Sequence, residues 1–250
     1  MHSLKNIPGF RIHSSTAASG FMGLAIAASL FGMQVSVIAA QPVPPALTAV
    51  HTGAISFSEE SRKVSEWIRH TSDNKSQAFA IIDKKAAVVH IFDRSGLKLA
   101  SSPVLLGLAI GDVSVPGIGE RKMAQILPAE RTTPAGRFVS EPGVNLQGKD
   151  IVWIDYDAAV SMHRVVTSNK ADRRLERLAT PYVSDKRISY GCVNVPVAFY
   201  DTFIKPVFGS QTAVIYVLPE TSEVSAFFNI GDVPMTLAAG AEKGIGGAAD

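Results

Sequence analysis

The stretch Arg187-Ile188-Ser189-Tyr190-Gly191-Cys192-Val193-Asn194-Val195-Pro196 contains Cys192, the only cysteine of the chain. The residues before Gly191 favour a short strand, and Gly191 permits a tight bend because it has no Cβ. Asn194 is a good helix N-cap and Pro196 suits a first helical turn, so we expect a helix to begin there. This predicts a strand-to-helix junction at Cys192, where helix N–H groups stabilise a nucleophilic thiolate. The alternative is a small buried side chain without chemistry.

Residues 1–40 have the character of a targeting segment. Lys5 and Arg11 are its only basic residues apart from histidine, acidic residues are absent, and an apolar run extends over residues 21–40. Small residues just before Gln41 fit cleavage, which predicts a signal peptide, with an uncleaved N-terminal membrane anchor as the alternative. Both predict an exported protein of the periplasm or cell envelope. In an oxidising compartment a single cysteine is buried, joined to another molecule, or reactive.

Composition sets limits on the rest of the chain. The formal net charge is +2 over 250 residues, which argues against a nucleic-acid binder that works by bulk electrostatics. A hydrophobic fraction of 46% is enough for a substantial core. We expect a proline-containing linker over residues 41–56, one domain over 57–219, and an Ala/Gly-rich, poorly ordered tail over 220–250.

The residue pattern predicts a mainly β fold with a few helices and a sandwich-like or barrel-like core. Thr133 to Gly136 fits a turn with proline at its second position. Helices are expected over 58–70, over the charged segment 169–179, and over 197–204. Strands are expected over residues 78–83, 86–93, 97–106, 137–140, 151–156, 160–166 and 212–218.

A cysteine nucleophile needs a base, usually histidine, within hydrogen-bond reach. Of the histidines beyond the targeting segment, His51 falls in the linker, His70 ends a helix, and His90 lies among apolar strand residues that indicate a structural role. His163 lies on the strand before the cysteine turn, and alternation places it on one face with Ser161. A return crossing through segment 169–179 brings this strand to Cys192, so His163 is the candidate base.

Two motifs carry a resemblance to a known family. The run Ser189-Tyr190-Gly191-Cys192-Val193-Asn194 resembles the nucleophile motif of the L,D-transpeptidases, the YkuD-type catalytic domain. The segment Thr133-Pro134-Ala135-Gly136-Arg137-Phe138 resembles the Thr-Pro-x-Gly-x-Phe segment upstream in that domain. The resemblance extends over residues 77–218. It implies a β-sandwich-like domain outside the cytoplasmic membrane that cuts a meso-diaminopimelate–D-alanine bond in peptidoglycan tetrapeptide stems.

The resemblance also implies roles for single residues. Cys192 is the nucleophile that holds the acyl group as a thioester, and His163 is the base. Backbone N–H groups around Tyr190, Gly191 and Cys192 form the oxyanion hole, and supporting roles fall to Ser189, Asn194 and Arg164. The acyl acceptor is an amine on a second stem, a wall-linked protein, or water. No metal or organic cofactor and no nucleic-acid partner is implied.

Three departures from the family pattern leave substrate choice open. Tyr190 stands where the family commonly has histidine, Arg164 stands where a small residue is usual, and the segment 169–187 is longer than usual. We interpret this basic segment as a solvated helix face in preference to a carboxylate-binding lid.

Several alternative functions remain open on the sequence, some with the same catalytic residues and one without catalysis. An L,D-carboxypeptidase or an amidase that releases wall-linked proteins has an identical site. A non-catalytic cell-wall-binding module has an inert Cys192. Papain-like peptidases fit poorly, because they place cysteine before histidine in the chain.

Overall fold

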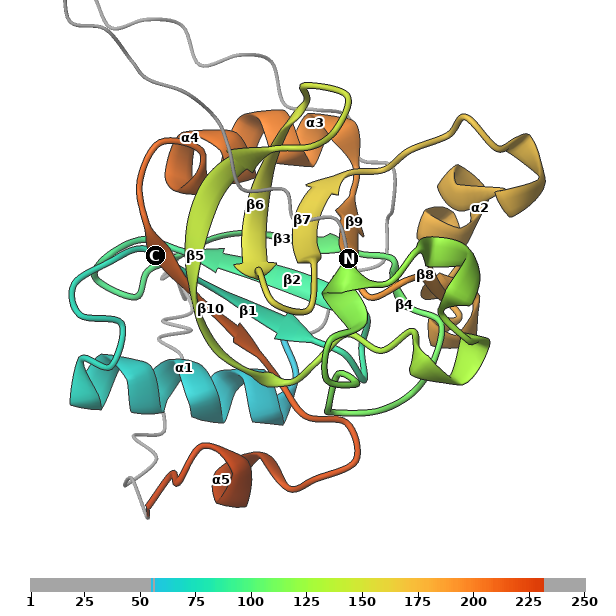
Figure 1. The fold of residues 1–250 in the computed structure, drawn as a ribbon. Helices are drawn as coiled ribbons and strands as arrows, with labels where there is room; N and C mark the ends of the chain where they lie inside the picture. The colour runs from blue at the N-terminus through green and yellow to red at the C-terminus, as the bar shows by residue number, and fades with distance from the viewer. Residues whose placement is uncertain (1–54, 56, 232–250) are drawn as a thin grey trace, which may run out of the picture. The chain divides into compact units, whose positions relative to one another are not determined.

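The computed structural model describes residue 55 and residues 57–231, which include a mixed sheet of eight strands in the order β3-β2-β1-β10-β5-β6-β7-β9 (Figure 1). The β1–β10 and β7–β9 pairs are parallel, and the other neighbours are antiparallel. A separate parallel pair joins β4 to β8. The strands are β1 (Phe79–Asp83), β2 (Val88–Phe92), β3 (Lys98–Pro103), β4 (Leu106–Gly107), β5 (Gly136–Val144), β6 (Asp150–Asp155), β7 (Val160–Arg164), β8 (Arg187–Ser189), β9 (Val193–Val195) and β10 (Ala213–Val217).

Helices make up a smaller part of this domain. The α-helices are α1 (Glu59–Thr71), α2 (Arg174–Ala179), α3 (Val197–Phe199), α4 (Lys205–Phe208) and α5 (Val224–Phe227), with a π-helical stretch (Tyr200–Ile204) joining α3 to α4. Short 3₁₀ turns are η1 (Ile118–Glu120), η2 (Met123–Gln125), η3 (Pro128–Glu130), η4 (Lys170–Asp172) and η5 (Val183–Lys186). The predicted mainly β fold with few helices is confirmed.

Strand β5 links the two halves of the sheet. Its first residues pair with β10, and its last residues, from Glu141 onward, pair with β6. The two halves pack on each other in one buried cluster, which joins Ala80 and Ile82 of β1 to Val152 of β6 and Met162 of β7. This arrangement is the sandwich-like core, and the β7–β9 edge that it supports carries Cys192.

A second buried cluster lies on the other face of β1 and β10. Because side chains alternate along a strand, Phe79 and Ile81 point away from the first cluster and pack with Val64 and Ile68 of α1. Figure 1 shows α1 below β1 and β10, with α5 below α1. Ser58 caps α1 by accepting the Ser61 N–H, so the helix predicted over 58–70 is confirmed.

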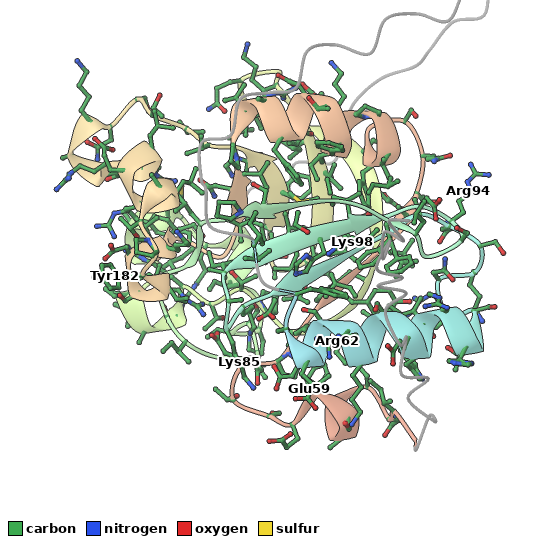
Figure 2. The ribbon with its side chains drawn as sticks, turned by 180° about the vertical axis from the view of Figure 1, so that it is seen from behind. Glu59, Arg62, Lys85, Arg94, Lys98 and Tyr182 are labelled. Atoms are coloured by element: carbon green, nitrogen blue, oxygen red, sulfur yellow. The ribbon has the colours of Figure 1, made fainter. Side chains whose placement is uncertain are left out.

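Charged and polar side chains cover the outside of these layers. Figure 2 shows Lys85 beside the N-terminal end of α1, where its ammonium lies 2.7 Å from the Glu60 carboxylate. The same view shows Tyr182 at the outer side of the segment between β7 and β8, and its side chain is exposed.

The helix predicted to begin at Asn194 is wrong. Residues Val193–Val195 form β9, Asn194 is buried within it, and α3 begins at Val197 after Pro196. β9 pairs with β7 on one side, and Asn194 exchanges backbone hydrogen bonds with Leu105 on the other. Two β-branched valines fit this buried strand better than they fit a helix start. Cys192 therefore precedes a strand, and the helix expected directly after it begins only at Val197.

Two further local predictions are corrected. Residues 133–135 do not form the expected turn: the Thr133 carbonyl accepts from the Lys84 ammonium at 2.9 Å, and the Ala135 N–H donates to the Asp112 carbonyl. The helix expected over 169–179 is broken into η4 and α2 by Arg173, which has φ 49°. Asn169 accepts from the Ala171 N–H and donates to Asp172, local bonds that compete with a continuous helix.

The domain continues past the predicted boundary at residue 219. Glu220 joins a buried ion network, and Val224 and Ile230 pack in the second core cluster. A poorly ordered tail is therefore wrong for residues 220–231, and the rest of that prediction lies outside the described residues. The signal peptide or anchor and nearly all of the linker lie outside them as well. Within the described part of the chain, no helix is long and apolar enough to span a membrane.

Candidate active site

Neighbouring parallel strands bring Cys192 and His163 together. In the β7–β9 register, Met162 is opposite Val193 and His163 is opposite Asn194. Since side chains alternate, Ser161 and His163 of β7 share one face with Cys192, which directly precedes β9. The Ser161 Oγ lies 3.6 Å from the Cys192 Sγ. The sheet register therefore builds a cluster of three functional side chains from two short segments.

Cys192 and His163 shift each other's pKa toward an ion pair. Burial raises the pKa of the Cys192 thiol, but its hydrogen bond with His163, the imidazolium charge, and hydrogen bonds from the Ser161 N–H and hydroxyl lower that pKa overall. Burial lowers the pKa of His163, but the hydrogen bond and charge of Cys192 raise it above its ordinary value. Each group therefore moves the other toward its charged form, thiolate for Cys192 and imidazolium for His163.

A backbone contact sets the proton positions on His163. Its Nδ1 lies 2.7 Å from the carbonyl oxygen of Arg164. A carbonyl only accepts, so Nδ1–H is the donor in this contact. This leaves Nε2 as the nitrogen that exchanges a proton with the thiol or with a reacting group.

The nucleophile turn is held by side chains on both sides. The Ser189 hydroxyl donates to the Cys192 carbonyl at 2.6 Å and accepts from the Gly191 N–H at 3.1 Å. Gly191 has φ +129°, and a Cβ there would lie 2.7 Å from the Thr132 carbonyl oxygen. Glycine is therefore required at this position by both backbone conformation and space.

The backbone N–H groups of the three predicted oxyanion-hole residues differ in whether they already donate a hydrogen bond within the protein. The Gly191 N–H is already donated to Ser189, so its predicted part in an oxyanion hole is corrected. Within residues 57–231, no acceptor contacts the N–H groups of Tyr190 and Cys192. These two donors on the turn remain open to an oxygen that approaches Cys192.

Asn194 joins the turn to the segment before β8. Its Nδ2 donates to the Cys192 carbonyl at 3.2 Å, and its Oδ1 accepts from Nη1 of Arg174 at 2.7 Å. Arg174 also donates from Nε to Asp172 at 2.9 Å. Asn194 thus contacts both the nucleophile turn and Arg174, a residue of the segment interpreted from sequence as a solvated helix face.

Arg164 reaches the pair only through its backbone. Its carbonyl accepts from His163, but its guanidinium pairs with Asp150 at 2.9 Å and with Asp201 at 2.5 Å. The same guanidinium lies 4.1 Å from the ring centre of Tyr200. Alternation along β7 explains this placement, because successive side chains point to opposite faces. Its side chain is not part of the thiol site.

Two cavities adjoin His163. One, of about 290 Å³, contains Cys192, Ser189, Tyr190, Asn194 and Arg174 in its wall. The other, of about 540 Å³, is lined by β6, β7 and residues of the β5–β6 connection. His163, Val166 and Ser168 line both. The imidazole therefore lies between two cavities, of which the smaller also has Cys192 in its wall.

Other histidines and polar clusters stay apart from this site. His70 is exposed at the end of α1, and His51 lies outside the described residues. His90 is fully buried with Nδ1 2.7 Å from the Ser101 hydroxyl, and burial lowers its pKa to about 4, so it has the structural role expected. No group of three or more His, Cys, Asp or Glu side chains among the described residues is arranged to hold a metal ion.

Ser161, Thr133 and Arg174 are the site residues that the sequence analysis did not assign. Alternation on β7 had placed Ser161 on the His163 face, so its position was within reach of the sequence. Thr133 belongs to a quoted motif, but its partner is distant in the chain: its hydroxyl donates to the Gly191 carbonyl at 2.8 Å. Nothing in the local pattern indicates the contact of Arg174 with Asn194.

Neither family models nor curated proteins match this chain. Among solved structures, an L,D-transpeptidase from Mycobacterium smegmatis is 17% identical over 56% of this chain and 58% of that one, with a TM-score of 0.31. The catalytic domain of the E. faecium L,D-transpeptidase is 15% identical over 57% of this chain and 98% of that one, with a TM-score of 0.30. The helical cell shape determining protein Pgp2 from Campylobacter jejuni is 12% identical over 66% of this chain and 58% of that one, with a TM-score of 0.40. The solved structures similar to this chain thus include several L,D-transpeptidases, at 15–17% identity and TM-scores of 0.27–0.31.

Proposed function

We propose that this chain is an exported cysteine acyltransferase that acts on peptidoglycan tetrapeptide stems through a thioester on Cys192. The observation that carries the proposal is the Cys192–His163 pair, in which each side chain shifts the pKa of the other toward its charged form. An inert cysteine needs no such partner, so the pair favours an enzyme over a binding module. The motif resemblance described above supplies the substrate class.

The first half-reaction follows from the groups around the thiol. The Cys192 thiolate attacks the carbonyl carbon of the meso-diaminopimelate–D-alanine amide, and the carbonyl electron pair moves onto oxygen. The open N–H groups of Tyr190 and Cys192 are the donors for that oxyanion. As the C–N bond breaks, the His163 imidazolium gives its Nε2 proton to the D-alanine amine. A thioester and neutral His163 result.

The second half-reaction regenerates the pair. Neutral His163 takes a proton from the attacking amine, the amine forms an amide with the acyl carbon, and the Cys192 sulfur leaves as thiolate. The second cavity supports this step, because His163 lines it and an acceptor bound there lies beside the imidazole that takes its proton. A second stem peptide is the acceptor we propose, with a wall-linked protein or water as the other outcomes.

Product analysis tests this proposal. Reduced, folded protein is incubated with disaccharide-tetrapeptide, and the products are separated by mass. We expect released D-alanine together with a crosslinked dimer. Release of D-alanine with hydrolysed stem alone would identify a carboxypeptidase. Absence of any product, with Cys192→Ser and His163→Ala as reference variants, would favour a wall-binding module.

A further inference from the structure

We propose that Arg174 binds a carboxylate of the acyl-donor peptide in the cavity that contains Cys192, an inference that rests on the proposed function. Arg174 begins α2 in the segment between β7 and β8, and its side chain lines this cavity together with Tyr190 and Asn194. The segment with the sequence pattern of a solvated helix face therefore contributes a side chain to the cavity of Cys192.

The guanidinium of Arg174 is fixed before any ligand arrives. Nε donates to the Asp172 carboxylate at 2.9 Å, and Nη1 donates to Asn194 at 2.7 Å. Asp172 is itself held by Asn169 through a hydrogen bond of 2.8 Å. Only 18% of the Arg174 side chain is exposed. Within the described part of the chain, Nη2 contacts no acceptor, which leaves N–H donors for a ligand.

The charges around the cavity leave Arg174 as its anion-binding group. Among the described residues that line it, Arg174 is the only arginine or lysine. Asp172 is the one carboxylate there, and its oxygens already accept from Asn169 and Arg174. The charge of Arg174 also lowers the pKa of His163, against the larger effect of Cys192, so its field extends to the reacting pair.

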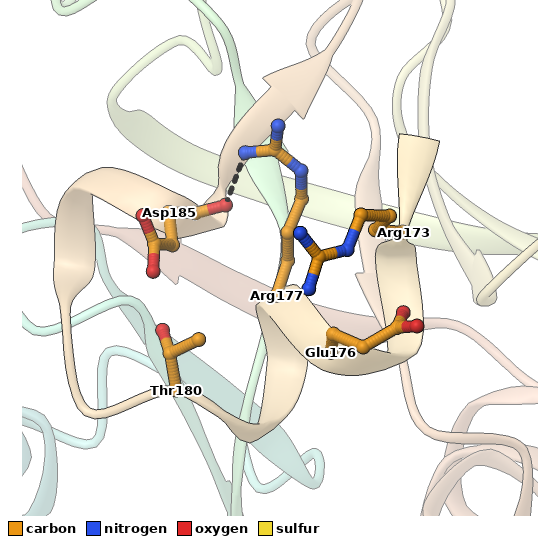
Figure 3. A pocket seen from close by; sticks show the side chains of 5 residues that line it. All are labelled: Arg173, Glu176, Arg177, Thr180 and Asp185. Carbon is orange, nitrogen blue, oxygen red and sulfur yellow. Dashed lines mark hydrogen bonds between the residues drawn. The ribbon is translucent and has the colours of Figure 1, made fainter. Parts of the chain in front are cut away.

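The other basic residues of this segment do not line the cavity of Cys192. Arg177 donates to the backbone carbonyls of Asp172 and Asp185, and Lys186 donates to three carbonyls at the end of α2. Arg173 is exposed and lines a separate hollow of about 150 Å³ with Glu176 (Figure 3). Arg173 and Arg174 are thus adjacent cations, of which only the second faces the thiol.

A tetrapeptide stem offers two carboxylates near the scissile amide. One is the C-terminal carboxylate of D-alanine, and the other is the carboxylate on the side chain of diaminopimelate. A guanidinium binds either with charge-assisted hydrogen bonds. Their shared chemistry defines the ligand, and amidation of one carboxylate at a time identifies which of them Arg174 holds.

The experiment compares stems and variants in one matrix. Values of kcat and KM are measured for the free-acid tetrapeptide and for its two monoamides. We expect the wild type to prefer the free acid over one monoamide by about 10- to 100-fold in kcat/KM, mainly through KM. Arg174→Gln should abolish that preference, Arg174→Lys should keep part of it, and Arg173→Gln should leave it unchanged.

If Arg174 only supports Asn194 and does not bind the peptide, the variants give a different result. If Arg174→Gln lowers kcat/KM equally for all the peptides, so that the preference persists, the residue only supports Asn194 and the inference is overturned. Calorimetry of the same peptides with Cys192→Ala protein measures binding without turnover. It therefore distinguishes failure of this inference from failure of the proposed function. Tighter binding of the free acid that disappears with Arg174→Gln supports the inference even without turnover. Equal binding of free acid and amides overturns it.

Discussion

The Thr133 hydroxyl joins the two segments that carry the family resemblance, because it donates to the Gly191 carbonyl at 2.8 Å. The same oxygen accepts from the Gly107 N–H at 2.9 Å. Thr133 is fully buried, and its own carbonyl accepts from Lys84. One side chain therefore ties the nucleophile turn to β4 and to the interior of the domain.

Thr133→Val should destabilise the protein and slow the reaction. The substitution keeps the shape of the side chain but leaves a buried N–H and a buried carbonyl without their partner, at a cost of about 1–3 kcal/mol each. Urea unfolding measures the stability, and alkylation of Cys192 reports on the turn. Thr133→Ser keeps the hydroxyl and should restore most of both. A loss in Thr133→Ser without a loss in Thr133→Val would mean that packing of the methyl group matters and the hydrogen bonds do not.

His163→Ala should slow alkylation of Cys192 at neutral pH by about tenfold or more. Loss of the hydrogen bond and of the imidazolium charge raises the pKa of the thiol, so less thiolate is present. The difference should shrink as the pH rises past the ordinary thiol pKa of 9.0, where both proteins are ionised. Iodoacetamide rates measured across pH check this. Parallel profiles for the two proteins would remove His163 from the base role.

Ser161→Ala should raise the pKa of Cys192 by less than His163→Ala does. The variant loses the hydroxyl that lies 3.6 Å from the sulfur but keeps the backbone N–H donor. We expect an alkylation profile between those of the wild type and His163→Ala. An unchanged profile would show that the Ser161 hydroxyl points elsewhere in solution.

Lys84→Met should lower the free energy of unfolding by about 3–5 kcal/mol, because it leaves buried carboxylates without their cation. The Lys84 ammonium is fully buried and lies 2.8 Å from Asp112 and 3.4 Å from Glu220. Lys85→Met is the matched control: its ion pair with Glu60 is partly exposed and worth about 0–1 kcal/mol. Urea denaturation of the two variants decides the matter. Similar losses would mean that the buried network contributes no more than a surface pair.

Asp112 should make stability depend on pH in the acid range. Burial raises the pKa of Asp112, but hydrogen bonds from Lys84, Thr221 and the Glu220 N–H lower it overall, below its ordinary 3.8. A lowered pKa in the folded state means that the stabilisation is present above pH 3.8 and is lost as the pH falls below that value. Thermal unfolding of wild type and Asp112→Asn between neutral and acid pH should show a flatter dependence in the variant.

Strand periodicity was sufficient to predict the fold class. Segments such as 78–83 and 212–218 are rich in β-branched and aromatic residues, and they form β1 and β10 as expected. Alternation placed His163 and Ser161 on one face, and the motif predicts Cys192 as the candidate nucleophile. These inferences depend on residues close together in the chain, whose strand alternation the structure retains.

Long-range contacts explain what the sequence analysis missed. Asn194 has the local chemistry of an N-cap, but pairing with β7 and Leu105 makes it part of a strand. Arg174 likewise donates to Asn194, a residue 20 positions further along the chain. None of these partners is adjacent in a periodic pattern, so no window of sequence reveals them.

Trapping the acyl-enzyme tests the central claim most directly. Reduced wild-type protein is mixed with disaccharide-tetrapeptide, quenched in acid, and its intact mass is measured. We predict added mass equal to the stem without D-alanine, located on Cys192 by peptide mapping, and absent from Cys192→Ser. A wild-type mass that stays unchanged under conditions where the protein is folded and the thiol is free would contradict the account.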